Sequence, residues 1–259
     1  PGTVFLSEAF TKPNMMQELA KVGYTQSYTY FTWRNTKHEL TEYLTELTQG
    51  PMKEYFRANF FANTPDILPE YLQQGGRPAF LIRAALAALT MPVYGIYSGF
   101  ELCENAPVPG KEEYIDSEKY QFKGRDWNAP GNIKDYVTRL NKIRSENRAL
   151  REYANLRTHT AENDQILCFS KTTTSLDEAL LVAVTVDPRN TQTAFVHVPL
   201  AEFGLTADEV YHVEDLITGE RYAWKGSRNF ISLDPHSRPA HVFRIRCSVA
   251  RVGGEDIFA

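Results

Sequence analysis

The sequence predicts an α/β region followed by an all-β region, and three patterns support this division. Residues 1–150 alternate short apolar runs with stretches of helical period, as βαβ units do. From about residue 158 the apolar period changes from 3.6 residues to 2, which is typical of strands with one buried face. Hydrophobic residues make up 42% of the 259 and charged residues 23%, which is the balance of a globular protein.

Four strand–helix units are expected in the first region. Their strands are expected at 4–6, 27–31, 58–61 and 93–97. Their helices are expected near 15–22, around Leu40 and Leu44, at 78–90, and around Ile133 and Val137, where apolar residues recur at helical spacing. Four units are half of a (β/α)8 TIM barrel. The alternative is an open, doubly wound sheet. The abrupt start on a strand favours a barrel half whose other half lies upstream.

The second region is expected to be an antiparallel β-sandwich. Its strands are expected at 166–169, 179–186, 193–198, 210–213 and 241–245. Short polar breaks separate these strands, as in a chain of antiparallel connections. We therefore predict two domains, a barrel half at 1–150 and a β-sandwich at 151–259 that ends in a short tail.

Composition excludes several classes of function. The net charge of −4 argues against a nucleic-acid partner. No stretch approaches the roughly 20 apolar residues of a membrane span, and the longest candidate, 79–91, is interrupted by Arg83. The odd set Cys103, Cys168 and Cys247 has no metal-ligand spacing and suggests a reducing, cytoplasmic compartment. The six histidines give no metal triad, and no phosphate-binding or dinucleotide-binding motif is present.

Two carboxylates follow predicted strands. Glu8 comes just after the first strand, and Asp66 comes shortly after the third. In a βα barrel the C-terminal ends of the strands open onto one face, so these acids can meet. Glu8 stands among apolar residues that would raise its pKa and suit a general acid, while Asp66 could stabilise positive charge on a sugar. The alternatives are a surface glutamate and a turn or helix-capping aspartate.

A third polar cluster follows the fourth predicted strand, at 101–105 and 116–120. Its loop would reach over the same end of the barrel. Lys119 offers a cation, and Tyr120 offers a ring and a phenol, as a phosphorylated sugar requires. The alternative is a solvated charged loop.

Five segments carry a resemblance to a known family. They read FLSEAFTKP at 5–13, TQSYTYFTWRN at 25–35, NTPDILP at 63–69, YGIYSGFELCEN at 94–105 and EYIDSEKY at 113–120. They resemble the α-1,4-glucan:maltose-1-phosphate maltosyltransferases, bacterial enzymes of the α-amylase superfamily. The resemblance covers nearly the whole chain and is denser through residue 150 than after it.

The resemblance implies a fold, a reaction and a set of site residues. It implies the second half of a catalytic (β/α)8 barrel and a C-terminal β-sandwich. It also implies retaining transfer of a maltosyl unit from α-maltose 1-phosphate to the non-reducing end of an α-1,4-glucan, as in glycogen, with no cofactor. By position, Glu8 matches the general acid/base and Asp66 the aspartate that stabilises the transition state. Lys119 and Tyr120 match positions that hold the maltosyl donor, and Asn63 is taken as a further substrate-binding position.

Two departures from the wider superfamily matter. Asn63-Thr64-Pro65 stands where most members have an Asn-His pair, which favours the maltosyltransferase branch. The nucleophilic aspartate, expected in an Arg-x-Asp context, is not in this chain, and Arg125-Asp126 comes too late to replace it. The family's phosphate-binding positions and dimerisation domains would also lie upstream, so a homodimer is expected only of the complete protein.

Other readings stay open at this point. The chain could belong to an α-glucan hydrolase or a trehalose-forming isomerase of the same superfamily. It could also be a non-catalytic, carbohydrate-binding fragment. As 259 residues alone we expect it to have no turnover.

Overall fold

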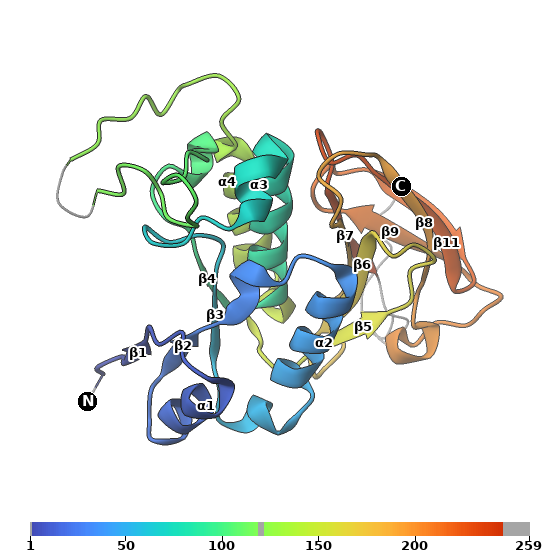
Figure 1. The fold of residues 1–259 in the computed structure, drawn as a ribbon. Helices are drawn as coiled ribbons and strands as arrows, with labels where there is room; N and C mark the ends of the chain where they lie inside the picture. The colour runs from blue at the N-terminus through green and yellow to red at the C-terminus, as the bar shows by residue number, and fades with distance from the viewer. Residues whose placement is uncertain (1, 119–121, 246–259) are drawn as a thin grey trace.

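A four-stranded parallel sheet forms the first part of the computed structural model, which describes residues 2–118 and 122–245. The strands lie in chain order and are β1 (Leu6–Ser7), β2 (Gln26–Tyr28), β3 (Ala58–Phe61) and β4 (Val93–Gly95). The helices that follow them are α1 (Pro13–Lys21), α2 (Lys37–Thr48), α3 (Glu70–Thr90) and α4 (Lys134–Glu146). The expected order of four strands, each followed by a helix, is therefore observed (Figure 1).

Several boundaries in this part differ from the expectation, and two of the differences have a clear local cause. β2 ends at Tyr28 instead of residue 31, because the Thr29 hydroxyl accepts a hydrogen bond from the Phe31 N–H and starts a short 3-10 helix, η1 (Tyr30–Trp33). α3 begins at Glu70, eight residues before the expected start at Pro78. Gly76 has a φ of 56° and divides α3 into two segments, so Pro78 lies at the start of the second one, where proline is favoured.

Helix α2 shows how local sequence sets an element. Thr36 and Glu39 form a reciprocal capping box at its start. Leu40, Leu44 and Leu47 are completely buried on one face, as their spacing predicts.

Antiparallel strands form the second part. A six-stranded sheet has the order β10-β9-β12-β7-β6-β5, and β11 pairs with β8 in a second, two-stranded sheet. Their bounds are β5 (Leu156–His159), β6 (Ile166–Thr172), β7 (Ala179–Thr185), β8 (Gln192–His197), β9 (Val210–Asp215), β10 (Arg221–Lys225), β11 (Arg228–Leu233) and β12 (Ala240–Ile245). A separate hydrophobic cluster, which includes Val196, Phe203 and Ile231, lies within this part.

The sequence did not predict β5, β10 or β11. In β5 only Leu156 is buried, and in β10 only Trp224 is buried. Both are edge strands of the six-stranded sheet, so most of their side chains face solvent. Their apolar alternation is accordingly weak, and that alternation is the signal on which strand prediction depends.

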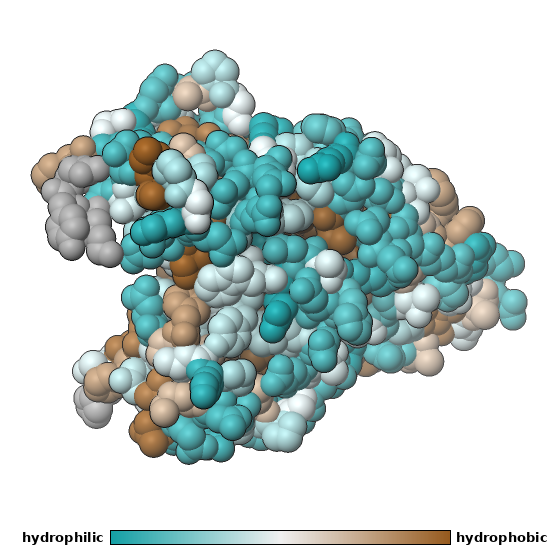
Figure 2. Space-filling model, in the orientation of Figure 1, coloured by the Kyte–Doolittle hydropathy of each residue, from teal (hydrophilic) through white to brown (hydrophobic). Residues whose placement is uncertain are grey.

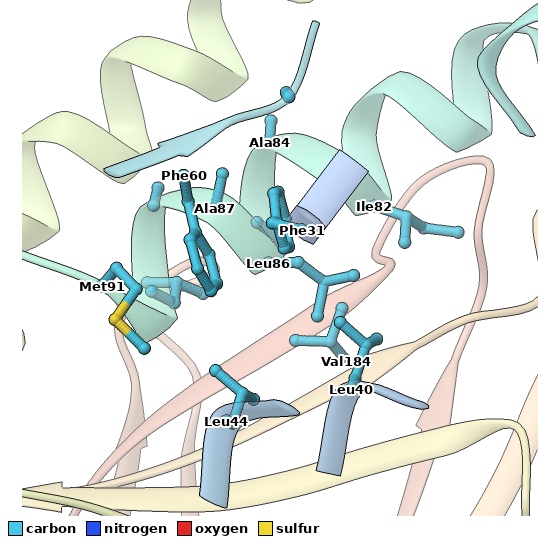
Figure 3. Packing of buried hydrophobic residues seen from close by; sticks show 14 of the residues in the cluster. Phe31, Leu40, Leu44, Phe60, Ile82, Ala84, Leu86, Ala87, Met91 and Val184 are labelled. Carbon is cyan, nitrogen blue, oxygen red and sulfur yellow. The ribbon is translucent and has the colours of Figure 1, made fainter. Parts of the chain in front are cut away.

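The two parts share one hydrophobic core. Figure 3 shows Phe31 and Phe60 of the first part, Leu40 and Leu44 of α2, and Val184 of β7 within one cluster. Helices α2 and α3 lie between the parallel sheet and the antiparallel one (Figure 1). Because the core crosses residue 150, the division into 1–150 and 151–259 stays a prediction. Among the described residues, no helix combines the length and apolarity that crossing a membrane requires.

Candidate active site

The parallel sheet has one face covered by helices and one face left open. Ser7, Ser27, Ala58 and Phe60 point toward the helices and are all at most 5% exposed. Side chains alternate along a strand, so Leu6, Tyr28, Phe61 and Gly95 point to the other side. Leu6 there is 50% exposed, and the other three are half-buried. We call this side the open face.

Glu8 lies on the open face, directly after β1. Continuing the β1–β2 register by one residue places it beside Tyr28. The pKa of Tyr28 is raised, first by burial of the phenol and then by the negative charge of Glu8, so the two groups are close. Glu8 itself is exposed, and the described residues do not enclose it in the apolar surroundings that the sequence suggested.

An aromatic row runs across the open face next to Glu8. The Phe10 and Tyr28 rings are 6.0 Å apart, and the Tyr28 and Phe61 rings are 4.6 Å apart. Phe61 reaches over Gly95, where a Cβ would lie within 2.7 Å of the ring. Glycine is therefore needed at 95 to admit Phe61. These residues share no motif in the sequence, because the row forms only once the strands are paired.

Asp66 lies at the tip of a tight turn that follows β3. Thr64 and Ile67 exchange both backbone hydrogen bonds across this turn, at 3.0 and 3.2 Å, and Asp66 is exposed between them. β1 and β3 are two strand spacings apart, about 10 Å. Both carboxylates thus follow the C-terminal ends of parallel strands, on the same edge of the sheet.

Asn63 holds the Asp66 turn against the neighbouring loop. Its side chain is completely buried, its Oδ1 accepts from the Tyr97 N–H at 2.8 Å, and its Nδ2 donates to the Tyr114 hydroxyl at 2.7 Å. Burial raises the pKa of Tyr114 above its usual range, which keeps the phenol neutral. Asn63 was expected to bind substrate, but both ends of its amide are bound to protein groups. Its geometry is that of a residue that positions Asp66.

Charged side chains organise the segment after β4. Arg125, whose side chain is 4% exposed, donates to Glu104 at 3.0 Å and to Glu118 at 2.7 Å. The hydrogen bond from Arg125 lowers the pKa of Glu118, which therefore stays ionised. Lys119 and Tyr120, the expected donor-binding residues, lie outside the described residues.

The acids of the site, as far as the described residues show, are not grouped as metal ligands would be. Nowhere in 2–118 and 122–245 do three or more His, Cys, Asp or Glu side chains gather in a way that could hold a metal ion. Exposed acids beside an aromatic row suit recognition of a sugar ring, whose apolar face packs on aromatic groups. In Figure 2 the surface is indented between the segment that follows β4, at the upper left, and the β1–α1 segment below it.

Solved structures define the fold class. An α-amylase from Geobacillus thermoleovorans matches 95% of this chain with a TM-score of 0.66 and 14% identity, and this chain covers 54% of it. An α-amylase from Malbranchea cinnamomea matches 97% with a TM-score of 0.63 and 14% identity, with 52% of that chain covered. The chain therefore has the fold of part of an α-amylase.

Several sequence relatives carry the same name. An α-1,4-glucan:maltose-1-phosphate maltosyltransferase from Rhodospirillum rubrum is 56% identical over 95% of this chain. Another, from Streptomyces coelicolor, is 53% identical over 98%. The family model described as "GLGE, C-terminal" matches residues 158–245. The chain thus corresponds in sequence to the C-terminal part of the maltosyltransferases, and it spans 36% and 38% of the length of these two relatives.

Proposed function

We propose that this chain is the C-terminal portion of a retaining maltosyltransferase, in which 1–150 complete a (β/α)8 barrel and 151–259 form the β domain. The observation that carries the proposal is the placement of Glu8 and Asp66 past the same edge of a parallel sheet. High identity to enzymes named maltosyltransferases supports the choice of reaction.

The open face supports the barrel. Parallel sheets are normally covered on both faces, yet Leu6 is half exposed here and the edge strand β1 is preceded by the exposed Val4 and Phe5. Further strands beside β1 and β4 would bury this apolar surface and close the sheet. They would also enclose Glu8, which the chain alone leaves in solvent.

The proposed mechanism is a double displacement. A carboxylate from the part of the enzyme outside this chain attacks the anomeric carbon of α-maltose 1-phosphate, and the C1–O bond to phosphate breaks. Glu8 acts as the acid that assists departure of phosphate, and Asp66 stabilises the positive charge that develops on the sugar. Glu8 then removes the proton of the acceptor's 4-hydroxyl as that oxygen displaces the carboxylate.

The remaining site residues would position the acids or contact the substrate. Asn63 holds the Asp66 turn, and Tyr28 and Phe61 supply an aromatic surface beside Glu8. Lys119 and Tyr120 stay predictions for binding the maltosyl donor. A cytoplasmic location and a homodimer of the complete protein stay predictions as well.

Product analysis tests the reaction class. The complete protein that contains this chain is incubated with α-maltose 1-phosphate and glycogen, and free phosphate, free maltose and chain length are measured. We expect phosphate release to match the number of maltosyl units added to glycogen. Release of one free maltose for each phosphate, with no lengthening of glycogen, would indicate a hydrolase and overturn the proposal.

A further inference from the structure

A large groove lies where the two parts of the chain meet, and the mechanism does not use it. Its volume is about 910 Å³. One wall comes from η1 and the start of α3, and the other comes from the chain before β6 and the loop between β7 and β8. Its lining includes Trp33, Tyr71, Gln74, Gln165, Arg189 and Asn190. We call it the junction groove.

The walls of the junction groove are held in place by the protein itself. The Tyr71 hydroxyl donates to the Val186 carbonyl at 2.9 Å and so ties α3 to the β7–β8 loop. Asp187 accepts from the backbone N–H of Arg189 at 2.8 Å and from the side chain of Gln192 at 2.7 Å. The loop is therefore preorganised, and a ligand would not have to order it on binding.

The wall that contains Trp33 is equally fixed. The Trp33 indole N–H donates to Glu112 at 2.8 Å, and the other oxygen of Glu112 accepts from the Glu70 N–H at 3.1 Å. Arg83, completely buried, donates to the carbonyls of Phe31 and Arg34 on either side of Trp33. The indole is thus held by its hydrogen bond to Glu112, and Arg83 holds the backbone on either side of Trp33.

The lining suits a neutral, polyhydroxylated ligand. The Gln74 and Asn190 amides already donate one N–H each, to Glu70 and Asp187, which leaves their carbonyl oxygens and their second N–H for ligand hydroxyls. The Gln165 amide, also in the lining, can donate to one hydroxyl and accept from another. Trp33 and Tyr71 provide aromatic surface for the apolar face of a sugar ring. The described charged lining residues are three acids and one base, Arg189, which disfavours a phosphorylated or polyanionic ligand.

The groove adjoins the edge that carries the acids. The Trp33 and Phe10 rings meet edge to face at 5.6 Å, and Phe10 is two residues after Glu8. Pro69, in the wall, is three residues after Asp66. A volume of about 910 Å³ is near the upper limit of common ligand pockets, so it is large enough for more than one sugar unit.

We propose that the junction groove is an accessory, non-catalytic binding site for a segment of an α-glucan chain. It would hold the polymer at a distance from the reacting end and so raise affinity for long acceptors over short ones. The identity of the ligand rests on the proposed function, whereas the existence of the site rests on the groove.

The test compares a groove variant with a matched surface variant of the complete protein. Gln74→Ala/Arg189→Ala removes two exposed groove side chains, and Lys225→Ala on the exposed side of β10 is the control. Migration in native gels containing glycogen reports binding without turnover, and KM and kcat are measured with glycogen and with maltotetraose.

We expect the groove variant to bind glycogen about fivefold more weakly, the effect of losing one or two ordinary hydrogen bonds, and to show a similar rise in KM for glycogen. Its kcat and its kinetics with maltotetraose should match those of the control. Unchanged glycogen binding would overturn the proposal. An equal rise in KM for maltotetraose would overturn it as well. Glycogen binding by a protein that transfers no maltosyl unit would instead contradict the proposed function alone.

Discussion

The two parts of the molecule differ in how many faces of their sheets are buried. In the antiparallel part every residue of β7 is buried, because helices of the first part cover one face and the β8–β11 sheet lies over the other. In the parallel part only one face is covered, and Leu6 on the other is half exposed. Among the described residues, both faces of β7 are covered, whereas one face of the parallel sheet stays open. The candidate acids lie on the part with the open face.

The largest expected effect comes from separating this chain from the rest of its protein. We expect the 259 residues alone to show no measurable phosphate release from α-maltose 1-phosphate, since the open face leaves Glu8 in solvent and the attacking carboxylate is outside the chain. The complete protein under the same conditions is the positive control. Turnover by the isolated chain would mean that the open face is already a finished site.

Arg83 provides the next largest effect, on stability. Its buried guanidinium donates to Phe31, Arg34 and Asn35. Arg83→Met leaves these acceptors unpaired in the core, so we expect the free energy of unfolding in urea to fall by about 3–5 kcal/mol. The exposed Arg77→Met should stay within about 1 kcal/mol of the parent. A small loss at Arg83 would mean that the acceptors find other partners.

Gly95 tests the aromatic row. A methyl group at this position would overlap the Phe61 ring, so Gly95→Ala should push Phe61 away from Tyr28 and destabilise the protein by about 1–3 kcal/mol. Gly124→Ala is the control, because no atom lies within 4 Å of the place that its methyl group would occupy and its φ is one that alanine can adopt. Equal stability of the two variants, measured by thermal unfolding, would show that the row tolerates displacement.

Lys171 gives an effect of a different kind, a dependence of stability on pH that is smallest near pH 7. Its amine is completely buried and donates to the Thr90 and Glu152 carbonyls, and burial lowers its pKa to about 7. The unfolded chain keeps the ordinary pKa of 10.5 and so binds more protons between these values.

Raising the pH from 7 toward 10 should therefore stabilise the parent relative to Lys171→Met, by at most about 1.4 kcal/mol per pH unit. The exposed Lys225→Met should follow the parent at every pH. The free energy of unfolding in urea is measured at each pH. If it changes with pH equally in the parent and in Lys171→Met, the buried amine does not change its protonation in this range.

The sequence predicted those features whose cause is local. The Leu40–Leu44 stripe and the capping residues Thr36 and Glu39 act within one helix, so their pattern is visible in the chain. The shared edge of Glu8 and Asp66 could be predicted because each follows a strand of the parallel sheet, whereas their catalytic roles stay a prediction. The strands β10 and β11 were missed because apolar and polar residues do not alternate clearly along them.

The features that the sequence did not predict depend on contacts between residues that are far apart in the chain. Asn63 binds groups 34 and 51 residues away, and nothing in its own segment indicates that its amide is fully used. Tyr28 lies beside Glu8 only through the β1–β2 register. The junction groove combines segments from both parts of the chain, so no single sequence motif indicates it.

Glu8→Gln in the complete protein, assayed for phosphate release with α-maltose 1-phosphate and glycogen, decides whether Glu8 is the general acid/base. An amide cannot give or take the proton that the leaving and entering oxygens require, so transfer should fall at least about 100-fold while glycogen binding persists. Glu18→Gln, on the exposed side of α1, should be unaffected. Near-normal transfer by Glu8→Gln would contradict the account.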